Sequence, residues 1–214
     1  MTRLRKPPSA ELIDRYGPVA LIAGASEGIG AAFARELAAM GLDLVLVARR
    51  AAPLEALADE LRAASGVRVR SFPYDLTNPG TAGAIVGACR GLEIGLLVYN
   101  AAASSVGRFL DIPIESHLRA VDVNARGPLL LAHAFGGAMA GRGRGGIVLM
   151  SSLTAFQGTP LVASYGATKA FNLVLAEGLW GELRRVLDAA LLLPHPRRCS
   201  PCLRGLRPRG WPGD

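Results

Sequence analysis

Short apolar runs alternate with amphipathic stretches along most of this chain. The runs are rich in Val, Leu, Ile and Ala and have the length of buried strands. The predicted strands are 19–23, 43–48, 67–72, 94–99, 146–151 and 188–193. Helical spacing of the apolar positions between them predicts helices at 29–40, 53–64, about 78–90, 113–139 and 163–185. Strands and helices that alternate in this way form parallel pairs through right-handed crossovers, so the pattern predicts an α/β fold with a doubly wound parallel sheet of about six strands.

Size and composition agree with one such domain. The chain has 214 residues, of which 50% are hydrophobic and 6% aromatic, which suits a core of buried strands and Ala- and Leu-rich helices. No apolar run reaches the ~18 residues that a membrane span needs, and the basic N-terminus has no apolar segment behind it, so no secretory signal is predicted. Three cysteines are too few for a disulfide scaffold, and we expect a cytoplasmic protein.

The net charge of +7 lies at the two ends of the chain. Residues 1–9 sum to +3 and residues 194–214 sum to +4, while the residues between them hold equal numbers of acidic and basic side chains. A basic isoelectric point of this origin gives no support to a nucleic-acid-binding face on the domain.

A glycine-rich turn follows the first predicted strand. Gly24, Gly28 and Gly30 separate the apolar run 19–23 from the helical pattern of 29–40. This layout directs backbone N–H groups and the positive end of a helix dipole at a phosphate. Glycine permits the sharp turn and lets a pyrophosphate approach the backbone. The turn therefore predicts a dinucleotide site, with an ordinary glycine-rich βα turn as the alternative.

Tyr165 and Lys169 give a second, independent signal. Lys169 lies four residues after Tyr165 within the predicted helix 163–185, so the phenol and the ammonium share one face of the helix. A fixed positive charge beside a phenol favours the phenolate and lowers the pKa from its usual ~10. The pair is typical of a tyrosine that transfers protons, although an isolated spacing of this kind more often reflects a solvated lysine.

Together these residues resemble the short-chain dehydrogenase/reductase family over about residues 18–193. The family's TGxxxGxG corresponds to the eight residues from Ala23 to Gly30, with alanine where threonine is usual. Its NNAG corresponds to the four residues from Tyr99 to Ala102, with two positions changed. The family's catalytic tetrad falls on Asn124, Ser152, Tyr165 and Lys169.

The resemblance implies hydride transfer between nicotinamide C4 and a carbonyl or alcohol carbon. Tyr165 would exchange a proton with the substrate oxygen, and Ser152 would hydrogen-bond the same oxygen. Ser151 is disfavoured for that role because it lies fourteen residues before Tyr165 rather than thirteen. Lys169 would favour the phenolate and hold the nicotinamide ribose. Asn124 would interrupt its helix and position a water that links Lys169 to solvent.

The resemblance also implies which residues hold the dinucleotide. They lie at the carboxyl ends of the predicted strands, where ligands of doubly wound sheets bind. The implied cofactor-binding residues are Gly24, Ser26, Gly28, Ile29, Gly30, Arg49, Asp75, Leu76, Asn100, Ala101, Tyr165 and Lys169.

The end of the second predicted strand favours NADP(H) over NAD(H). NAD-binding proteins usually have an acidic residue here for the adenosine ribose, whereas this chain has Ala48 followed by Arg49 and Arg50. A guanidinium matches a 2′-phosphate in charge and geometry, and Arg49 is the preferred candidate. A solvated arginine pair is the alternative, and Glu27 in the glycine turn slightly weakens the NADP(H) prediction.

Asp75 follows the third predicted strand and has two possible roles. It matches the family's adenine-contacting aspartate by resemblance, and an aspartate here also suits an Asx turn or a helix N-terminus. The sequence does not choose between them.

Residues 194–214 depart from the family pattern. The family continues with Pro-Gly, a threonine, substrate-covering helices and a last strand, whereas 13 of these 21 residues are Pro, Arg or Gly. That composition excludes a central strand. We therefore expect an N-terminal extension at 1–17, a domain at 18–193 without the last family strand, and an irregular tail at 194–214. A shifted reading frame and a genuine basic extension both explain the tail.

Two functions follow for the whole chain. One is an oxidoreductase that transfers a hydride between NADP(H) and a small-molecule carbonyl or alcohol, and the other is a catalytically silent chain that binds a dinucleotide or dimerises. We expect a homo-oligomer through helices 113–139 and 163–185. No metal site is predicted, because His195, Cys199 and Cys202 lack a fourth ligand nearby. The residues after Ser152 that indicate an apolar substrate group are Leu153, Phe156, Leu161 and Val162.

Overall fold

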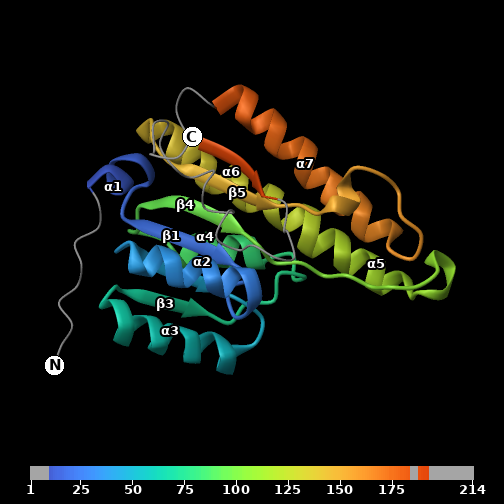
Figure 1. The fold of residues 1–214 in the computed structure, drawn as a ribbon, viewed down its shortest axis with the longest axis horizontal. Helices are drawn as coiled ribbons and strands as arrows, with labels where there is room; N and C mark the ends of the chain where they lie inside the picture. The colour runs from blue at the N-terminus through green and yellow to red at the C-terminus, as the bar shows by residue number, and fades with distance from the viewer. Residues whose placement is uncertain (1–9, 184–187, 193–214) are drawn as a thin grey trace, which may run out of the picture.

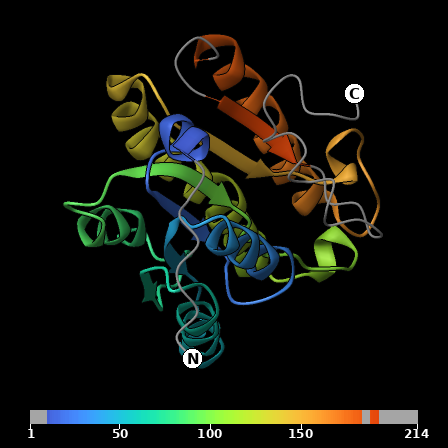
Figure 2. The ribbon, with the colours of Figure 1, turned by 60° about the vertical axis from the view of Figure 1, so that its left-hand side comes forward.

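The structure, a computed structural model, describes residues 10–183 and 188–192, with side chains up to residue 183. A parallel sheet forms the middle layer and helices cover both of its faces (Figures 1 and 2). The strands are β1 Val19–Ala23, β2 Asp43–Val47, β3 Val69–Phe72, β4 Ile94–Tyr99, β5 Gly146–Met150 and β6 Asp188–Leu192. Their spatial order is β3-β2-β1-β4-β5-β6. The doubly wound α/β sheet predicted from the sequence is confirmed.

The helices follow the predicted alternation. Their bounds are α1 Ala10–Tyr16, α2 Gly28–Ala39, α3 Ala51–Ser65, α4 Thr81–Ala88, α5 Ile114–Val121, α6 Gly127–Arg142 and α7 Ala163–Leu183. Short 3₁₀ turns occur at η1 Phe109–Asp111 and η3 Leu153–Ala155, and a π-helical turn occurs at η2 Asp122–Arg126. None of the helices within the described residues is long and apolar enough to cross a membrane.

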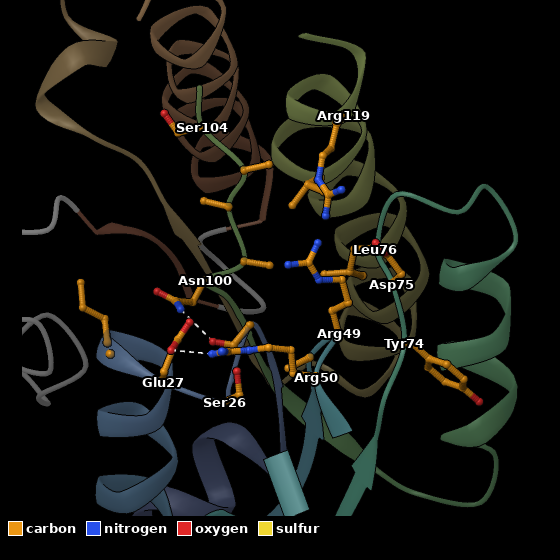
Figure 3. A pocket seen from close by; sticks show the side chains of 18 of the residues that line it. Ser26, Glu27, Arg49, Arg50, Tyr74, Asp75, Leu76, Asn100, Ser104 and Arg119 are labelled. Atoms are coloured by element: carbon orange, nitrogen blue, oxygen red, sulfur yellow. Dashed lines mark hydrogen bonds and ion pairs between the residues drawn. The ribbon is translucent and has the colours of Figure 1, made fainter. Parts of the chain in front are cut away.

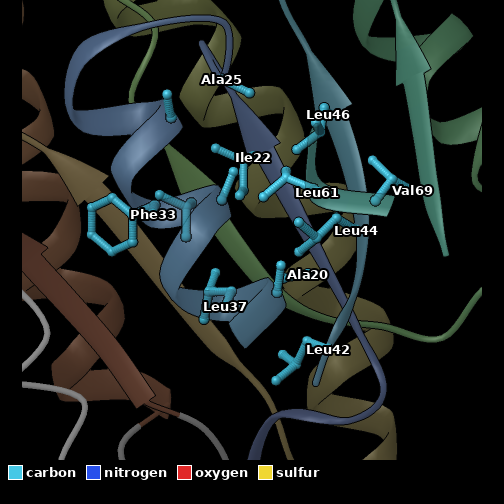
Figure 4. Close-up of a cluster of buried hydrophobic side chains, with 14 of the residues drawn as sticks. Ala20, Ile22, Ala25, Phe33, Leu37, Leu42, Leu44, Leu46, Leu61 and Val69 are labelled. Atoms are coloured by element: carbon cyan, nitrogen blue, oxygen red, sulfur yellow. The ribbon is translucent and has the colours of Figure 1, made fainter. Parts of the chain in front are cut away.

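Two hydrophobic clusters, one on each face, hold the layers together. The first packs α2 and α3 against the sheet around Ile22, Phe33 and Leu37 (Figure 4). The second packs α4, α6 and α7 against the other face around Ile85 and Leu131. Every side chain of β1, β2, β4 and β5 is buried, which explains why these strands appear in the sequence as continuous apolar runs without alternation.

Helix α1 lies inside the predicted N-terminal extension, and the sequence analysis did not predict it. Its last residue, Tyr16, is 1% exposed and belongs to the first hydrophobic cluster. Gly95 makes room for it, since a Cβ on Gly95 would lie 1.4 Å from the Tyr16 carbonyl oxygen. The signal was therefore in two glycines that flank the tyrosine in space, Gly95 and Gly146, and not in the periodicity of α1 itself.

The single helical stretch predicted over 113–139 is divided in the structure. It comprises α5, the π-helical turn η2 and α6, and α6 continues to Arg142. Asn124 lies in the middle of η2, so the interruption falls where the resemblance implied it. A π-helical turn places one extra residue in the helix, which bare apolar spacing does not reveal.

The order of the strands in the sheet indicates where a ligand is expected to bind. The chain leaves β1 towards β2 on one side and returns to β4 on the other, so β1 and β4 are neighbours whose following loops diverge. A crevice at the carboxyl ends of the strands is the usual binding place in sheets of this kind.

Candidate functional site

The glycine turn after β1 is built by close backbone contacts. Gly24 and Gly28 have positive φ angles of 82° and 57°, which favour glycine. Gly30 lies where α2 approaches the turn, and a Cβ there would be 2.0 Å from the Gly24 carbonyl oxygen. At Gly28 an added Cβ would meet open space. The first turn of α2 therefore faces the crevice with its backbone N–H groups, the arrangement that suits a phosphate.

The end of β4 locks this turn in place. The backbone N–H groups of Asn100 and Ala101 both donate to the Ala23 carbonyl at 2.9 Å. The Asn100 side-chain amide donates to the Gly24 carbonyl at 2.9 Å. Gly24 in turn has no room for a side chain, because a Cβ would lie 2.5 Å from the Ala101 nitrogen. The ends of β1 and β4 are thus one rigid unit.

A cavity of about 780 Å³ opens above this unit. Nine of the twelve predicted cofactor-binding residues line it: Gly24, Ser26, Gly28, Ile29, Arg49, Asp75, Leu76, Asn100 and Ala101. The other three, Gly30, Tyr165 and Lys169, lie outside its lining. Because most of the predicted set converges on one cavity, the pattern of strand-end residues located the crevice.

The two arginines after β2 differ in their surroundings. The Arg50 guanidinium lies 2.6 Å from the Glu27 carboxylate. Arg49 lines the same cavity and forms no such ion pair with the described residues (Figure 3). Arg50 and Glu27, which weakened the NADP(H) prediction, therefore line the cavity as an ion pair, while Arg49 lines it without a paired carboxylate among the described residues.

Asp75 forms an Asx turn at the cavity, and its contact with adenine stays a prediction. Its Oδ1 accepts from the Thr77 backbone N–H at 3.0 Å and from the Thr77 hydroxyl at 2.9 Å, which is an Asx turn. Its carboxylate also lines the cavity. Burial raises the pKa of Asp75, but the bonds from Thr77 and the positive charges of Arg119 and Arg49 outweigh this effect and leave the pKa below its ordinary value.

The two serines after β5 have different environments. The Ser151 hydroxyl is buried and donates to the Lys169 backbone carbonyl at 2.8 Å. The Ser152 hydroxyl is half-buried and accepts from the Thr154 hydroxyl at 3.0 Å. Ser151 is committed to the contact between β5 and α7, which leaves Ser152 as the more accessible of the two serines.

Asn124 is fully buried at the π-helical turn. Its Oδ1 accepts from the Ala103 N–H at 2.7 Å. Its Nδ2 donates to the Ala103 carbonyl at 2.8 Å and to the Thr168 hydroxyl at 3.0 Å. The side chain thus ties the loop after β4 to α7, one residue before Lys169. The water relay that the resemblance implied stays a prediction.

Tyr99 supports this turn from the end of β4, and sequence reasoning missed that role. Its buried hydroxyl donates to the Val123 carbonyl at 2.6 Å. Burial raises the pKa of the Tyr99 phenol, so the hydroxyl keeps the proton that it donates. Gly127 accommodates the ring, since a Cβ there would lie 2.1 Å from the hydroxyl oxygen. The clue in the sequence was the combination of Tyr99, in the altered NNAG motif, with Gly127 at the start of α6.

Tyr165 and Lys169 lie on one face of α7, as the spacing predicts. The Lys169 ammonium is 5.7 Å from the centre of the Tyr165 ring. It donates to the Met150 carbonyl at 2.9 Å, and the side chain is 3% exposed. Burial lowers the pKa of Lys169 to about 8. The lysine is therefore a desolvated cation beside a half-buried phenol, which is the electrostatic setting for proton transfer.

Two further residues shape the loops around the tetrad. The ring nitrogens of His117 on α5 form hydrogen bonds with the Ser164 hydroxyl at 2.8 Å and the Phe109 carbonyl at 3.0 Å, so both nitrogens have partners. Leu161 has a φ of 68°, which is strained for a leucine. Its carbonyl accepts from the Gly107 N–H at 2.9 Å and so joins the loop before α7 to the loop after β4.

Residues 18–186 match the family described as short chain dehydrogenase. The chain belongs to this family. The membership predicted from the motifs is thus confirmed, and with it the placement among oxidoreductases. The chain is 36% identical over 168 residues to 7beta-hydroxysteroid dehydrogenase of Collinsella aerofaciens, covering 78% of this chain and 64% of that protein. It is 34% identical to a very-long-chain 3-oxoacyl-CoA reductase-like protein of Arabidopsis thaliana, covering 81% of this chain and 57% of that protein.

Solved structures of other short-chain dehydrogenases superpose closely on this one. A 7beta-hydroxysteroid dehydrogenase has a TM-score of 0.82 at 34% identity, covering 85% of this chain and 71% of that chain. A short-chain dehydrogenase from Sphingobium yanoikuyae in complex with NADPH has a TM-score of 0.79 at 39% identity, covering 83% and 70%. One from Burkholderia phymatum in complex with NAD has a TM-score of 0.77 at 29% identity, covering 82% and 64%. The short-chain dehydrogenase fold here thus has relatives solved with either dinucleotide.

Proposed function

We propose that this short-chain dehydrogenase transfers a hydride between NADP(H) and a carbonyl or alcohol substrate, with Tyr165 as the general acid and base. The observation that carries the proposal is the buried Lys169 ammonium, held against the end of β5 and facing the Tyr165 ring. A buried ammonium destabilises the folded chain. Stabilisation of the Tyr165 phenolate would explain why the chain has a lysine at this position.

The residues divide the chemistry among themselves. A bound nicotinamide supplies or accepts the hydride. Tyr165 donates its hydroxyl proton to the substrate oxygen in reduction and takes it back in oxidation, while Lys169 stabilises the phenolate that forms. Ser152 offers its hydroxyl to the same oxygen and fixes the position of the substrate. Asn124 holds α7 and the loop after β4 in register.

The cavity fits a dinucleotide. Its volume of about 780 Å³ is in the range of cofactor sites, and Gly28 leaves open space in front of the α2 N-terminus. The preference for NADP(H) over NAD(H) is supported by Arg49, whose guanidinium has no carboxylate partner among the described residues. Relatives solved with NADPH and with NAD leave this preference to the residues of the chain.

An apolar, bulky carbonyl compound is the proposed substrate class. Leu153, Phe156 and Leu161 are exposed on the two loops that follow β5 towards Tyr165. The similar proteins include hydroxysteroid dehydrogenases, 3-oxoacyl-CoA reductases and an alcohol dehydrogenase of Comamonas testosteroni specific for bulky-bulky ketones. Steroids, very long acyl chains and bulky ketones are all large substrates, and a large apolar substrate would suit the exposed side chains.

A homo-oligomer is proposed through the helices that carry the tetrad. Large apolar side chains are exposed along α5, α6 and α7 in the described part of the chain: Ile114, Leu118, Val121, Leu129, Leu130, Phe171, Val174 and Trp180. An exposed apolar surface of this extent on long helices is typical of an interface between subunits. Sedimentation of the purified chain would show a dimer or larger species.

The experiment that tests the activity compares the parent chain with Tyr165→Phe. We expect the parent to oxidise NADPH with a steroid ketone or a 3-oxoacyl thioester, and the variant to lose at least ~1000-fold in turnover because no group replaces the phenolic proton. Its affinity for NADPH, measured by cofactor fluorescence, should stay within about twofold. A variant with a tenth of the parent rate would contradict the assignment. If the parent bound NADPH but did not oxidise it with any ketone, the result would favour the catalytically silent chain that only binds a dinucleotide.

A further inference from the structure

A second guanidinium faces Arg49 across the cavity. It belongs to Arg119 on α5, which lines the same cavity although its sequence neighbours gave no sign of this. Figure 3 shows Arg119 reaching into the cavity from one side and Arg49 reaching towards it from the end of β2, with Asp75 and Leu76 next to them. Arg50 also lines the cavity and pairs there with Glu27.

The two facing guanidiniums are poorly neutralised. Among the residues with described side chains, neither Arg49 nor Arg119 has a carboxylate within ion-pair distance, whereas Arg50 is paired with Glu27 at 2.6 Å. The ionised carboxylate of Asp75 acts electrostatically on both guanidiniums, so one negative charge is set against two positive ones. Two like charges that converge on one opening raise the local potential and favour an anionic ligand there.

We propose that Arg119 is a second anchor for the adenosine 2′-phosphate, opposite Arg49, and that it helps to determine the choice of NADP(H) over NAD(H). This inference rests on the proposed function, because it requires that the cavity binds the dinucleotide. A 2′-phosphate carries close to two negative charges and three acceptor oxygens, so it can satisfy a guanidinium on each side.

Other parts of the dinucleotide match this pair less well. The diphosphate is accounted for by the glycine turn and the N-terminus of α2, on the side of Ser26 and Gly28. The adenine ring is neutral and would leave two facing cations uncompensated. The 2′-phosphate is the remaining anionic group, and NAD(H) lacks it. Arg119 therefore distinguishes the two cofactors only if it contacts this phosphate.

The test measures dissociation constants by cofactor fluorescence for the parent chain and for Arg119→Gln, Arg49→Gln and the double variant. A charge-assisted bond to an exposed guanidinium is worth about a tenfold change in affinity. We expect Arg119→Gln to weaken NADPH about tenfold and NADH less than twofold. The double variant should bind NADPH and NADH equally. Competition by 2′,5′-ADP and by 5′-AMP should show the same contrast, since only the first carries the 2′-phosphate.

Arg90→Gln is the matched control. Arg90 is exposed just after α4, outside the cavity lining, so the variant loses the same formal charge elsewhere. Its affinities should equal those of the parent. Arg119 is exposed and its loss should leave the fold intact, which the melting temperature of each variant verifies.

Three outcomes would overturn the inference. An unchanged NADPH affinity in Arg119→Gln, with a loss in Arg49→Gln, would leave Arg49 as the single anchor and the proposed cofactor intact. Equal weakening of NADPH and NADH would assign Arg119 to the adenine or the diphosphate. A parent chain without any preference for NADPH would overturn the NADP(H) proposal together with the role of Arg119.

Discussion

The proposed dinucleotide cradle and the proposed catalytic tetrad lie at the same edge of the sheet but are built in opposite ways. The cradle is made by missing side chains: Gly24 and Gly30 let backbone approach backbone, and a Cβ at either would meet atoms within 2.6 Å. The tetrad is supported by buried polar side chains, among them Asn124 and Lys169, whose hydrogen bonds connect β4, β5 and α7. Steric space defines the first region and hydrogen-bond partners define the second.

The difference determines how each region tolerates change. Backbone contacts in the cradle cannot relax, so an added methyl group must displace a whole segment. The polar contacts of the tetrad carry a cost in desolvation of charged and polar groups. Removing such a group can therefore increase the free energy of unfolding while it abolishes function.

Gly30→Ala should have the largest effect. The new Cβ would lie 2.0 Å from the Gly24 carbonyl oxygen and 2.8 Å from the Asn100 amide, which forces α2 away from the turn. We expect a loss of about 3 kcal/mol or more in unfolding free energy, together with loss of NADPH binding. Urea unfolding and a fluorescence titration measure the two effects.

Gly83→Ala is the control for this change. Gly83 lies in α4, where an added Cβ meets nothing within 4 Å, so alanine should raise stability by about 0.5–1 kcal/mol through helix propensity. If both alanine variants behaved alike, the close approach of α2 to the glycine turn would not be the cause.

Lys169→Met should abolish turnover and stabilise the unliganded chain. Burial lowers the pKa of Lys169 to about 8. Below pH 8 both the folded and the unfolded chain hold this proton, and the folded state then bears the cost of a buried charge. Between pH 8 and the ordinary value of 10.5 only the unfolded chain holds it, so the folded parent gains stability as the pH rises. The gain amounts to about 3 kcal/mol across the whole window.

The measurement is therefore a difference between two proteins over pH. Unfolding free energies of the parent and of Lys169→Met are compared from pH 7 to pH 10, so that other titrating groups cancel. The advantage of the methionine variant should be greatest at pH 7 and shrink towards pH 10. A difference that does not vary with pH would show that the ammonium is not desolvated in the folded chain.

Tyr99→Phe should have the smallest effect, and it tests whether the support of the tetrad can be separated from its chemistry. The variant loses the hydrogen bond to the Val123 carbonyl and keeps the ring against Gly127. We expect a loss of about 1–2 kcal/mol in unfolding free energy. The turnover number should fall several-fold while the KM for NADPH stays unchanged, because the π-helical turn positions Asn124 and not the cradle. A fall in both parameters would place the effect in the cradle.

The sequence predicted one region more completely than the other. Strand-end glycines and the Tyr-Lys spacing follow from local geometry, so the residue pattern together with the family resemblance was enough to name Gly24, Gly30, Tyr165 and Lys169 as candidates. Arg119 could not be assigned in this way, because its position in the cavity depends on how α5 crosses the sheet.

Pairings between distant segments were also beyond the sequence. The pairing of Arg50 with Glu27 at the cavity depends on the approach of the β2 end to the glycine turn. Helix α1 escaped prediction because its burial rests on Gly95 and Gly146, far along the chain. Local periodicity reports local structure, and these features are products of tertiary packing.

The different contacts of the two serines after β5 mean that turnover should depend on the register in which β5 pairs with β4. Successive side chains of extended backbone point to opposite sides, so Ser151 is directed to the Lys169 carbonyl and Ser152 to the side of Thr154. If β5 slipped by one residue along β4, the side chains after it would face the opposite sides, and the Ser152 hydroxyl would point away from Thr154 and from the proposed substrate position. A slip of two residues would return the side chains to their original sides of the sheet, but Ser151 would no longer lie opposite the Lys169 carbonyl on α7. The proposed chemistry at this edge thus depends on which side of the sheet each residue of β5 faces, as well as on which residues are present.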